Sequence, residues 1–275
     1  MSRRNLQHYA YFTFHYIVLS LWAIVVIGPI LWVVVSSVKP NDEVFRLSIP
    51  SLIKLDNYLI PFQTRPYGRY YLNSVIFVAI ATFSNLFFCS LTGYGFAKYR
   101  FWGRDVFFIF TIATMMIPVH VIVVPLFLMF NKLRWIDSFP GLISPFLITA
   151  FGIFLMRQHA RKIPNDYIYS ARIDGTKEFG IYLRVILPLS KSIVATLAIL
   201  NAIGFWDEFL WPLIIATSPR TRTLSVGISM FITSYQTPVN QMFAVSVCAM
   251  APLLVAYAIG QRHFIRSLAL TGLKE

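Results

Sequence analysis

Near its amino end the chain carries an apolar segment that is too long and too free of charge for the interior of a soluble domain. From Tyr9 to Val38 it contains no Asp, Glu, Lys or Arg, and His15 is its only readily titrating side chain. A helix needs about 20 mostly apolar residues to cross a bilayer. The segment is longer than the apolar region of a secretory signal peptide and lacks a small-residue cleavage site. We therefore expect an uncleaved transmembrane helix.

Five further segments share this character, and the composition favours a membrane domain. Only 13% of the 275 residues are charged, whereas soluble domains carry about 25%. We predict an all-α integral membrane protein in which residues 1–275 form a single domain. The six expected spans cover about residues 12–38, 70–97, 106–131, 139–157, 192–216 and 240–262, and the last follows a polar cluster at 234–238.

Lys and Arg residues set the expected orientation. Six crossings place both termini on one side of the membrane, and short cytoplasmic segments carry an excess of Lys and Arg. Most of the 24 Lys and Arg residues fall on the side of the amino terminus. We therefore expect both termini, and the long connection 158–191, in the cytoplasm. Orientation and anionic lipid headgroups then account for the net charge of +13, without nucleic acid as a partner.

The connection between the fourth and fifth spans contains the ordered sequence IPNDYIYSARIDGTKEFGIYLRVILP, residues 163–188. Pro164 and Asp166 suit the first turn of a helix, where a missing N–H is tolerated and a negative charge favours the macrodipole. Gly175 provides a helix stop, and Thr176 can cap a second short helix. We expect a first helix of about ten residues, which is marginal in water without packing partners.

One face of this helix is small. At i, i+4 spacing Ser170 lies above Asp174 and Ala171 above Gly175, which suits close contact with another surface. The residues alone are equally consistent with a loop helix that rests on the membrane interface.

This stretch resembles the conserved cytoplasmic loop of ABC importer permeases, patterned E-A-A, three residues, G, nine residues, I, one residue, L-P. Ser170 and Ala171 fall on the two alanines, Gly175 on the glycine, and Pro188 ends the signature after a ten-residue gap. Tyr169 departs from the family's usual Glu. Further matching segments are MMIPVHVIVVPLF (115–127), GFWDEFLWPL (204–213), RTLSVGISMF (222–231) and the tail QRHFIRSLALTGLKE (261–275).

Together these segments resemble the second permease subunit of maltose-type carbohydrate importers, in the bacterial cytoplasmic (inner) membrane. The resemblance implies a type I ABC importer permease that couples to a separate ATPase through the loop 158–191. It implies as partners a second permease subunit, two ATPase subunits, an extracytoplasmic solute-binding protein and a sugar, with an oligosaccharide as the expected class. The implied ATPase-coupling residues are Asp166, Ser170, Ala171, Arg172, Asp174, Gly175 and Pro188, with the tail 272–275 as a lesser candidate.

The chain has no G-x-x-x-x-G-K-[ST] loop to hold phosphates. We therefore expect no cofactor on this chain and no catalytic residue, with ATP and Mg bound by the partner ATPases. The histidines show no metal-ligand spacing. Cys89 and Cys248 lie inside apolar runs, where we expect them to pack in the core.

Asp207 and Glu208 are the only carboxylates inside an apolar run. Charged groups at such positions usually face a cavity or a partner. They and the neighbouring Trp206 and Trp211 are candidates to line a hydrated sugar pathway. The alternative, which we weigh somewhat higher, is an interfacial anchor with the tryptophans in the aromatic belt.

The resemblance also implies that the segment 222–231 is an outward loop near the binding protein, with Leu224, Gly227 and Phe231 as contact candidates. Within the same family, an importer of a glycerol-phosphate-type polyol is the main alternative. An ion-driven carrier would require an inverted repeat and intramembrane ion ligands, neither of which is evident. A membrane-embedded enzyme would require more clustered His, Asp or Glu side chains than this sequence offers.

Overall fold

The computed structural model describes the backbone of residues 3–231 and 238–272, and the side chains of residues 11–231 and 238–258. Within these ranges every regular element is a helix. The chain divides into two compact units, which are described separately. Unit 1 comprises residues 1–66 and 230–250, and unit 2 comprises residues 67–229 and 251–275. Most of the predicted polar cluster at 234–238 lies outside the described residues.

Unit 1 contains three helices of its own and the first part of a fourth that continues into unit 2. They are α1 (Arg3–Ser37), η1 (Asn41–Glu43), α2 (Asp56–Thr64) and the start of α14 (Val239–Gly272).

Unit 2 contains the remaining helices. In chain order they are α3 (Tyr67–Lys98), α4 (Arg104–Ala113), η2 (Thr114–Met116), α5 (Val119–Lys132), α6 (Phe139–Ile143), η3 (Ser144–Phe146), α7 (Ala150–Lys162), α8 (Asp166–Ile173), α9 (Glu178–Ile181), η4 (Tyr182–Ile186), α10 (Leu187–Leu189), α11 (Lys191–Trp206), α12 (Leu210–Ile215) and α13 (Leu224–Ser229). η4 is a π-helical turn.

Three described helical segments are each long and apolar enough to cross a membrane: Tyr11–Ser37, Tyr67–Lys98 and Val239–Ala258. Three pairs of shorter helices pass the same test only when taken together. These pairs are bent by 102° between α4 and α5, by 42° between α6 and α7, and by 81° between α10 and α11. If each bent pair is one span, the described residues provide up to six.

The bend in the third expected span, 106–131, has a local cause. Pro118 precedes the first residue of α5, and Ile117 before it adopts an extended backbone (φ −88°, ψ 115°). Steric clash with a following proline disfavours the helical conformation, so a helix tends to end before it. The apolar run is therefore divided into two helices.

The fifth expected span, 192–216, is interrupted where the two carboxylates lie. α11 ends at Trp206 with Asp207 as its C-cap, and α12 begins at Leu210. The Glu208 carboxylate accepts a hydrogen bond from the Trp211 backbone N–H (3.2 Å). A carboxylate at the amino end of a helix satisfies an otherwise unpaired N–H, which favours a new helix start here.

In unit 1 a buried polar cluster joins the end of α1, α2 and the start of α14. The Asn57 side chain donates to the backbone carbonyls of Ser37 (2.8 Å) and Lys39 (3.0 Å). The Asn240 side chain donates to the Asn57 side-chain oxygen (2.9 Å) and to the same Lys39 carbonyl (3.2 Å). Because these amides are buried, the loss of either would leave polar groups unsatisfied.

The core of unit 2 is built around α3, which packs against α7 and α11. α3 and α7 approach closely because each has a glycine at the contact. A Cβ added to Gly93 of α3 would lie 2.6 Å from the Met156 Cβ, and one added to Gly152 of α7 would lie 2.7 Å from the Cys89 Sγ. Small residues of this kind allow membrane helices to approach closely. Both cysteines were expected to pack in the core: Cys89 is buried, whereas Cys248 is half-buried.

Asn85 of α3 joins this core through side-chain hydrogen bonds. Its amide nitrogen donates to the Phe146 carbonyl (3.0 Å), and its oxygen accepts from the Asn201 side chain of α11 (2.9 Å). Interhelical hydrogen bonds between amides are a recurrent stabilising contact in membrane helix bundles.

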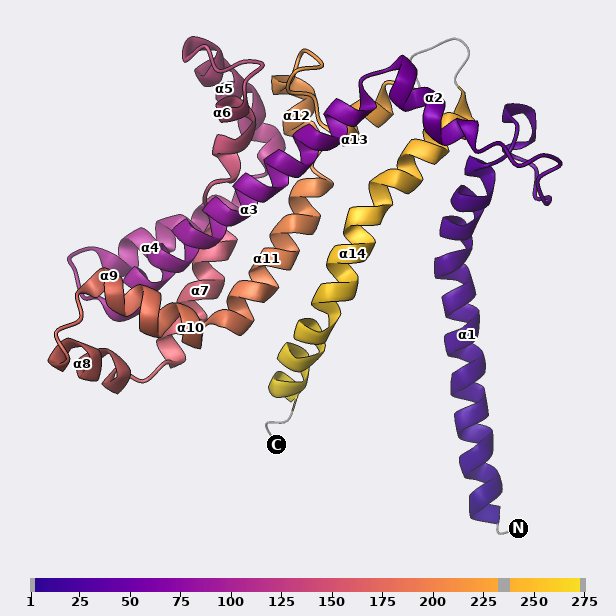
Figure 1. The fold of residues 1–275 in the computed structure, drawn as a ribbon. Coiled ribbons are helices and arrows are strands. Elements are labelled where there is room, and N and C mark those ends of the chain that lie inside the picture. Colours follow the sequence, from indigo (N-terminus) through magenta and orange to yellow (C-terminus); the bar gives the residue numbers. More distant parts are fainter. Residues whose placement is uncertain (1–2, 232–237, 273–275) are drawn as a thin grey trace. The chain divides into compact units, whose positions relative to one another are not determined.

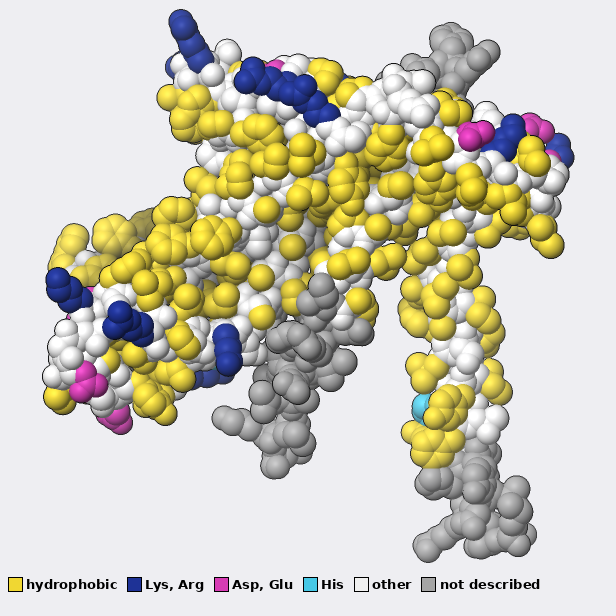
Figure 2. Space-filling view, viewed as in Figure 1, with side chains coloured by type: hydrophobic (Ala, Val, Ile, Leu, Met, Phe, Trp, Pro, Cys, Tyr) yellow, Lys and Arg dark blue, Asp and Glu magenta, His cyan; other side chains and the backbone are white. Residues whose placement is uncertain are grey.

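The ribbon shows two well-separated ends of unit 2 (Figure 1). α3 runs from the end where α6, α12 and α13 lie to the end where α8, α9 and α10 gather, and we call these the α12 end and the α8 end. In the space-filling view Lys and Arg side chains gather at both ends, whereas hydrophobic side chains cover the surface between them (Figure 2). This distribution is that expected of a bundle surrounded by lipid.

Candidate functional site

The predicted coupling segment forms a helical hairpin at the α8 end. α8 covers eight residues, with Asn165 as its N-cap and Asp166 in its first turn. Pro164 lies before the N-cap, so its predicted place in the first turn is wrong. α9 has Lys177 as its N-cap, and the predicted capping by Thr176 is also wrong. The chain enters α8 two residues later, and α9 one residue later, than the sequence pattern indicates.

α8 ends at Ile173 with Asp174 as its C-cap, and Gly175, the predicted stop, follows with a φ of +76°. The Thr176 N–H donates to the Ala171 carbonyl (2.9 Å), and the Gly175 N–H donates to the Arg172 carbonyl (3.0 Å). These two bonds form a Schellman motif, which requires a left-handed residue at the glycine position. No atom outside the immediate chain neighbours lies within 4 Å of a Cβ built on Gly175.

The exposed face of α8 differs from the small face expected. Ile168 and Ala171, three residues apart, are buried against the rest of unit 2. Ser170, Asp174 and Gly175 are exposed, as are Asp166 and Arg172. Sequence reasoning missed Ile173, whose side chain is 86% exposed at the end of α8, and the half-exposed ring of Tyr169. The available surface is therefore a mixture of apolar and acidic groups around Ile173.

Two sets of polar contacts hold the hairpin against the end of α3. The Lys98 ammonium donates to the Ile163 carbonyl and to the Asn165 side chain (2.9 Å). On the other arm, the Glu178 carboxylate accepts from the Tyr99 hydroxyl and from the Arg172 guanidinium (2.7 Å).

This geometry shifts the pKa values of Tyr99 and Arg172. Burial and the hydrogen bond to Glu178 raise the pKa of Tyr99 well above its usual range. The hydrogen bond to Glu178 also raises the pKa of Arg172.

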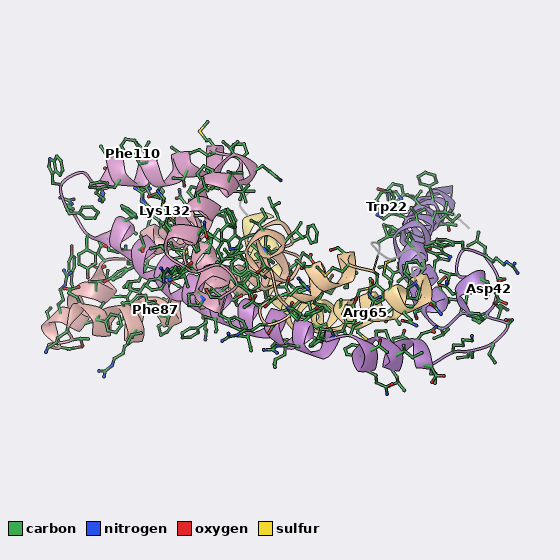
Figure 3. The ribbon with its side chains drawn as sticks, turned by 90° about the horizontal axis from the view of Figure 1, so that it is seen from above. Trp22, Asp42, Arg65, Phe87, Phe110 and Lys132 are labelled. Atoms are coloured by element: carbon green, nitrogen blue, oxygen red, sulfur yellow. The ribbon has the colours of Figure 1, made fainter. Side chains whose placement is uncertain are left out.

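An aromatic cluster lies behind these polar contacts. The rings of Tyr94 and Tyr182 are stacked with centroids 6.2 Å apart, and the hydroxyl of Tyr182 is 2.7 Å from that of Ser90 in α3. The Phe87 ring, labelled beside this segment in Figure 3, meets Tyr182 edge-on at 6.4 Å. With buried Ile181 these residues form the inner wall of the hairpin.

Pro188 is exposed within α10, directly after the π-helical turn of η4. A proline cannot donate to the carbonyl four residues before it, here that of Arg184. The switch from α- to π-helical hydrogen bonding at this point is consistent with that missing donor. Pro188 therefore shapes the return arm of the hairpin.

The four pathway candidates lie in different environments. Asp207 is exposed in the break between α11 and α12, and Glu208 is half-buried and bonded to α12. Trp211 is buried, and its indole N–H donates to the Gly141 carbonyl (3.0 Å). Trp206 is half-buried and meets Tyr71 edge-on at 5.6 Å.

Trp206 also lines an apolar cleft of about 250 Å³ in unit 2. The other lining residues come from α3, α11 and the second part of α14, and they are Val75, Val78, Ala79, Ala202, Pro252, Leu253 and Ala256. Of the four candidates, only Trp206 lines this cleft.

The three residues expected to contact a binding protein are buried. Leu224 N–H donates to the Ser74 hydroxyl (2.8 Å), and the Gly227 carbonyl accepts from the Tyr67 hydroxyl (3.0 Å). A Cβ on Gly227 would lie 2.4 Å from the Tyr70 ring. Phe231, which belongs to unit 1, is also buried. These residues position the segment 222–231, whose other residues are buried or half-buried.

Sequence reasoning also missed a polar cluster at the α12 end. Asp137 adopts a φ of +54°. Its carboxylate accepts from the Ser218 N–H (3.0 Å), the Ser218 hydroxyl (2.5 Å) and the Thr221 hydroxyl (2.5 Å). Burial alone would raise the pKa of Asp137, but the bonds from Ser218 and Thr221 outweigh it and lower the pKa. The cluster fastens the loop before α6 to the turn after α12.

Residues 88–270, more than half of the chain, match the family described as the binding-protein-dependent transport system inner membrane component. The chain belongs to that family. Its members are transport permeases, so this inner membrane component is a multi-pass membrane permease. The matched range includes the whole hairpin and the α11–α12 break.

Relatives of this inner membrane component agree with the match. An arabinooligosaccharides transport system permease protein, AraQ of Bacillus subtilis (strain 168), is 34% identical, covering 98% of this chain and 99% of that protein. A diacetylchitobiose uptake system permease protein, NgcG of Streptomyces coelicolor, is 30% identical over 91% of this chain and 85% of that protein. An sn-glycerol-3-phosphate transport system permease protein, UgpE of Pectobacterium atrosepticum, is 33% identical over 75% of this chain and 74% of that protein.

The fold is shared with a solved transporter. A chain in the crystal structure of a bacterial ABC transporter involved in the import of the acidic polysaccharide alginate superposes with a TM-score of 0.85. The match covers 96% of this chain and 99% of that chain at 22% identity. With the family match, this confirms the predicted fold class, an all-α permease of the type I ABC importers. Among the described residues, no group of three or more His, Cys, Asp or Glu side chains could hold a metal ion.

Proposed function

We propose that this inner membrane component is one of two permease subunits of an ATP-driven oligosaccharide importer. In this proposal, residues 1–275 act as one transmembrane domain that lines half of the translocation pathway. The chain carries no catalytic residue. ATP and Mg are bound by two partner ATPase subunits, and an extracytoplasmic solute-binding protein delivers the sugar. The α8 end and both termini face the cytoplasm.

The observation that carries the coupling role is the exposed surface of α8. Ile173 is 86% exposed at the tip of a hairpin whose other isoleucines, Ile163, Ile168, Ile181 and Ile186, are all buried. Burial of an isoleucine side chain is worth about 1.5–3 kcal/mol, so a partner that covers Ile173 gains affinity. Around it, Asp166, Ser170, Asp174 and Gly175 are exposed and able to contact the same partner.

The remaining predicted coupling residues have supporting roles in this proposal. Ala171 is buried and sets the distance between α8 and the body of unit 2. Arg172 bonds Glu178 within the hairpin, and Pro188 shapes the return arm. We propose that an ATPase subunit grips α8 and that closure of the ATPase dimer moves the permease between inward-facing and outward-facing states.

The names of the relatives support an oligosaccharide as the substrate class. Two of them are permease proteins for arabinooligosaccharides and diacetylchitobiose, and they match nearly the full chain. The glycerol-3-phosphate permease protein matches a smaller share of it and supports the alternative, a polyol-phosphate importer.

We propose Trp206 and Asp207 as the residues of this chain that face the pathway. An indole face can stack on a sugar ring, and an exposed carboxylate can accept hydrogen bonds from sugar hydroxyls. Trp211 and Glu208 support this region from behind, because both are engaged in bonds that hold α12. Half-buried residues beside Leu224, Gly227 and Phe231, namely Ser225, Ile228 and Met230, are proposed to meet the binding protein.

Cross-linking tests the coupling role. In the assembled importer, with Cys89 and Cys248 replaced by serine, a thiol-specific photo-cross-linker is placed at Asp174→Cys. We expect an adduct with an ATP-hydrolysing subunit. The matched control is Tyr16→Cys, an exposed position on α1, which should give no such adduct. Adducts from Asp174→Cys with lipid or water alone would overturn the proposal.

A binding measurement tests the substrate class. Calorimetric titration of the cognate binding protein with arabino-oligosaccharides, chitobiose and glycerol 3-phosphate should show binding of an oligosaccharide. Tight binding of glycerol 3-phosphate alone would replace the main proposal by the polyol-phosphate alternative.

A further inference from the structure

We infer that Lys98, Tyr99 and Glu178 are positioning residues that clamp the α8 hairpin to the end of α3, so that movement of the hairpin is carried along α3 to the α12 end. The inference rests on the proposed coupling function and adds a route by which force crosses the membrane.

The hairpin is attached to α3 on both of its arms. On the entry arm, Lys98 donates to the Ile163 carbonyl and to the Asn165 side chain (2.9 Å). On the exit arm, the Tyr99 hydroxyl donates to Glu178. These two polar attachments on opposite arms add to the buried packing of Ile168, Ile181 and Tyr182 and further restrict rotation of the hairpin. Lys98 and Tyr99 are adjacent, so both attachments act on the same point of α3.

Glu178 joins three elements through one carboxylate. One oxygen accepts from Tyr99 after α3, and the other accepts from Arg172 of α8 (2.7 Å). The Arg172 and Glu178 side chains are 43% and 50% exposed. Exposed ion pairs contribute little to stability. Loss of this contact should therefore leave the protein folded while freeing α8 to turn relative to α3.

α3 is suited to carry the motion onward. It is a single helix of 32 residues with no internal proline, and so about 48 Å long. By contrast, α1, α5 and α14 each contain a proline. Helix kinks arise mainly at proline, so α3 should move as one rod.

The far end of α3 is bonded to the segment 219–227 at the α12 end. The Asn73 side chain donates to the Arg222 carbonyl (2.9 Å), and the Ser74 hydroxyl accepts from the Leu224 N–H (2.8 Å). The Tyr67 hydroxyl donates to the Gly227 carbonyl (3.0 Å). α3 therefore holds the hairpin at one end and the segment 219–227 at the other. We propose that the binding protein acts beside that segment.

The test uses the complete importer with its binding protein, reconstituted in liposomes. Tyr99→Phe removes one hydroxyl, and Glu178→Gln removes the charge of the shared carboxylate. We expect both variants to assemble and to hydrolyse ATP at the basal rate. The stimulation of ATPase activity by the substrate-loaded binding protein should fall about tenfold, within the usual range of coupling between distant sites. The number of ATP molecules hydrolysed per sugar imported should rise.

Matched controls separate the clamp from general damage. Arg184→Gln removes an exposed charge from the same segment, and Tyr16→Phe removes a hydroxyl from an exposed position on α1; both should behave as wild type. Lys98→Arg keeps a cationic donor and should retain coupling that Lys98→Met loses. The effect of the double variant of Tyr99→Phe and Glu178→Gln should be smaller than the sum of the two single effects, because both changes act on the same contact.

The outcomes distinguish the clamp from the proposed function. Wild-type stimulation and wild-type ATP use in Tyr99→Phe would overturn the clamp, even if Asp174→Cys still cross-links to the ATPase. Absence of that cross-link in the otherwise unchanged chain would instead overturn the coupling function. If Glu178→Gln fails to assemble, Tyr99→Phe decides, since it deletes a single oxygen atom.

Discussion

Gly175 permits a substitution series that separates backbone strain from contact with a partner. Its φ of +76° lies in the left-handed region, where an L-residue with a Cβ is disfavoured by about 1–2 kcal/mol. Asn tolerates this region better than other residues. A Cβ at this position would meet no atom of this chain within 4 Å. Ala and Leu therefore carry about the same strain within the permease and differ mainly in what they present outward.

The expected sizes follow from that geometry. Gly175→Asn should transport at close to the wild-type rate. Gly175→Ala should lose about 5- to 30-fold in the population of the correctly ended helix, the factor that 1–2 kcal/mol represents, and up to that much in uptake. Gly175→Leu should abolish uptake, because the same strain is joined by a clash with the ATPase that grips α8. Membrane insertion should be unchanged in all three.

The assay is initial-rate sugar uptake by proteoliposomes that contain equal amounts of each assembled variant, with circular dichroism as a check on folding. The informative quantity is the ratio of the Ala and Leu rates. Equal rates for Ala and Leu would refute close approach of a partner at Gly175, and the docking surface would then have to lie elsewhere on the hairpin.

Three further predictions address the rest of unit 2. Gly93→Val should reduce the yield of assembled importer, since overpacking costs about 1–3 kcal/mol or more, whereas Gly95→Ala on the same helix meets nothing within 4 Å and should be neutral by size-exclusion chromatography. Asp137→Asn should lower the stability of the complex by about 1–3 kcal/mol. Because folding lowers the pKa of Asp137, the stabilisation from its carboxylate is fully present above the ordinary pKa of 3.8 and is lost as the pH falls through the lowered pKa. The melting temperatures of wild type and variant should therefore differ at neutral pH and converge in acid. Glu208→Ala should alter uptake far more than expression, and Glu208→Gln, which keeps an acceptor for the Trp211 N–H, should restore most of it; unchanged kinetics in Glu208→Ala would favour a purely interfacial role.

The long spans could be predicted from the sequence because bilayer thickness sets their length and lipid excludes charge. The charge-free runs at 9–38 and 70–97 correspond to α1 and α3 for this reason. The divided spans were harder to predict, because an apolar run looks the same whether it is straight or bent. Pro118 gave a local signal for one break, but the break at 207–209 depends on a bond from Trp211 to Glu208 that composition does not indicate.

The same limit applies to the candidate site. Gly175 was predictable because a left-handed helix end has a strong local preference for glycine. Tyr99 and Glu178 are separated by 79 residues, and no local pattern connects them. The exposure of Ile173 and the burial of Leu224 depend on how the hairpin and the segment 222–231 pack, which a single sequence does not specify.

The tight seam between α3 and α7 limits which parts of the permease can change shape. With the Gly93 Cβ position 2.6 Å from the Met156 Cβ, and that of Gly152 2.7 Å from the Cys89 Sγ, the two helices have no room to slide or to rotate past each other. The two helices must therefore move as one rigid body during the transport cycle. Opening and closing of the permease then depends on more weakly packed segments. The non-helical residues 207–209, which carry two acids between α11 and the short helix α12, are the natural place for such a change.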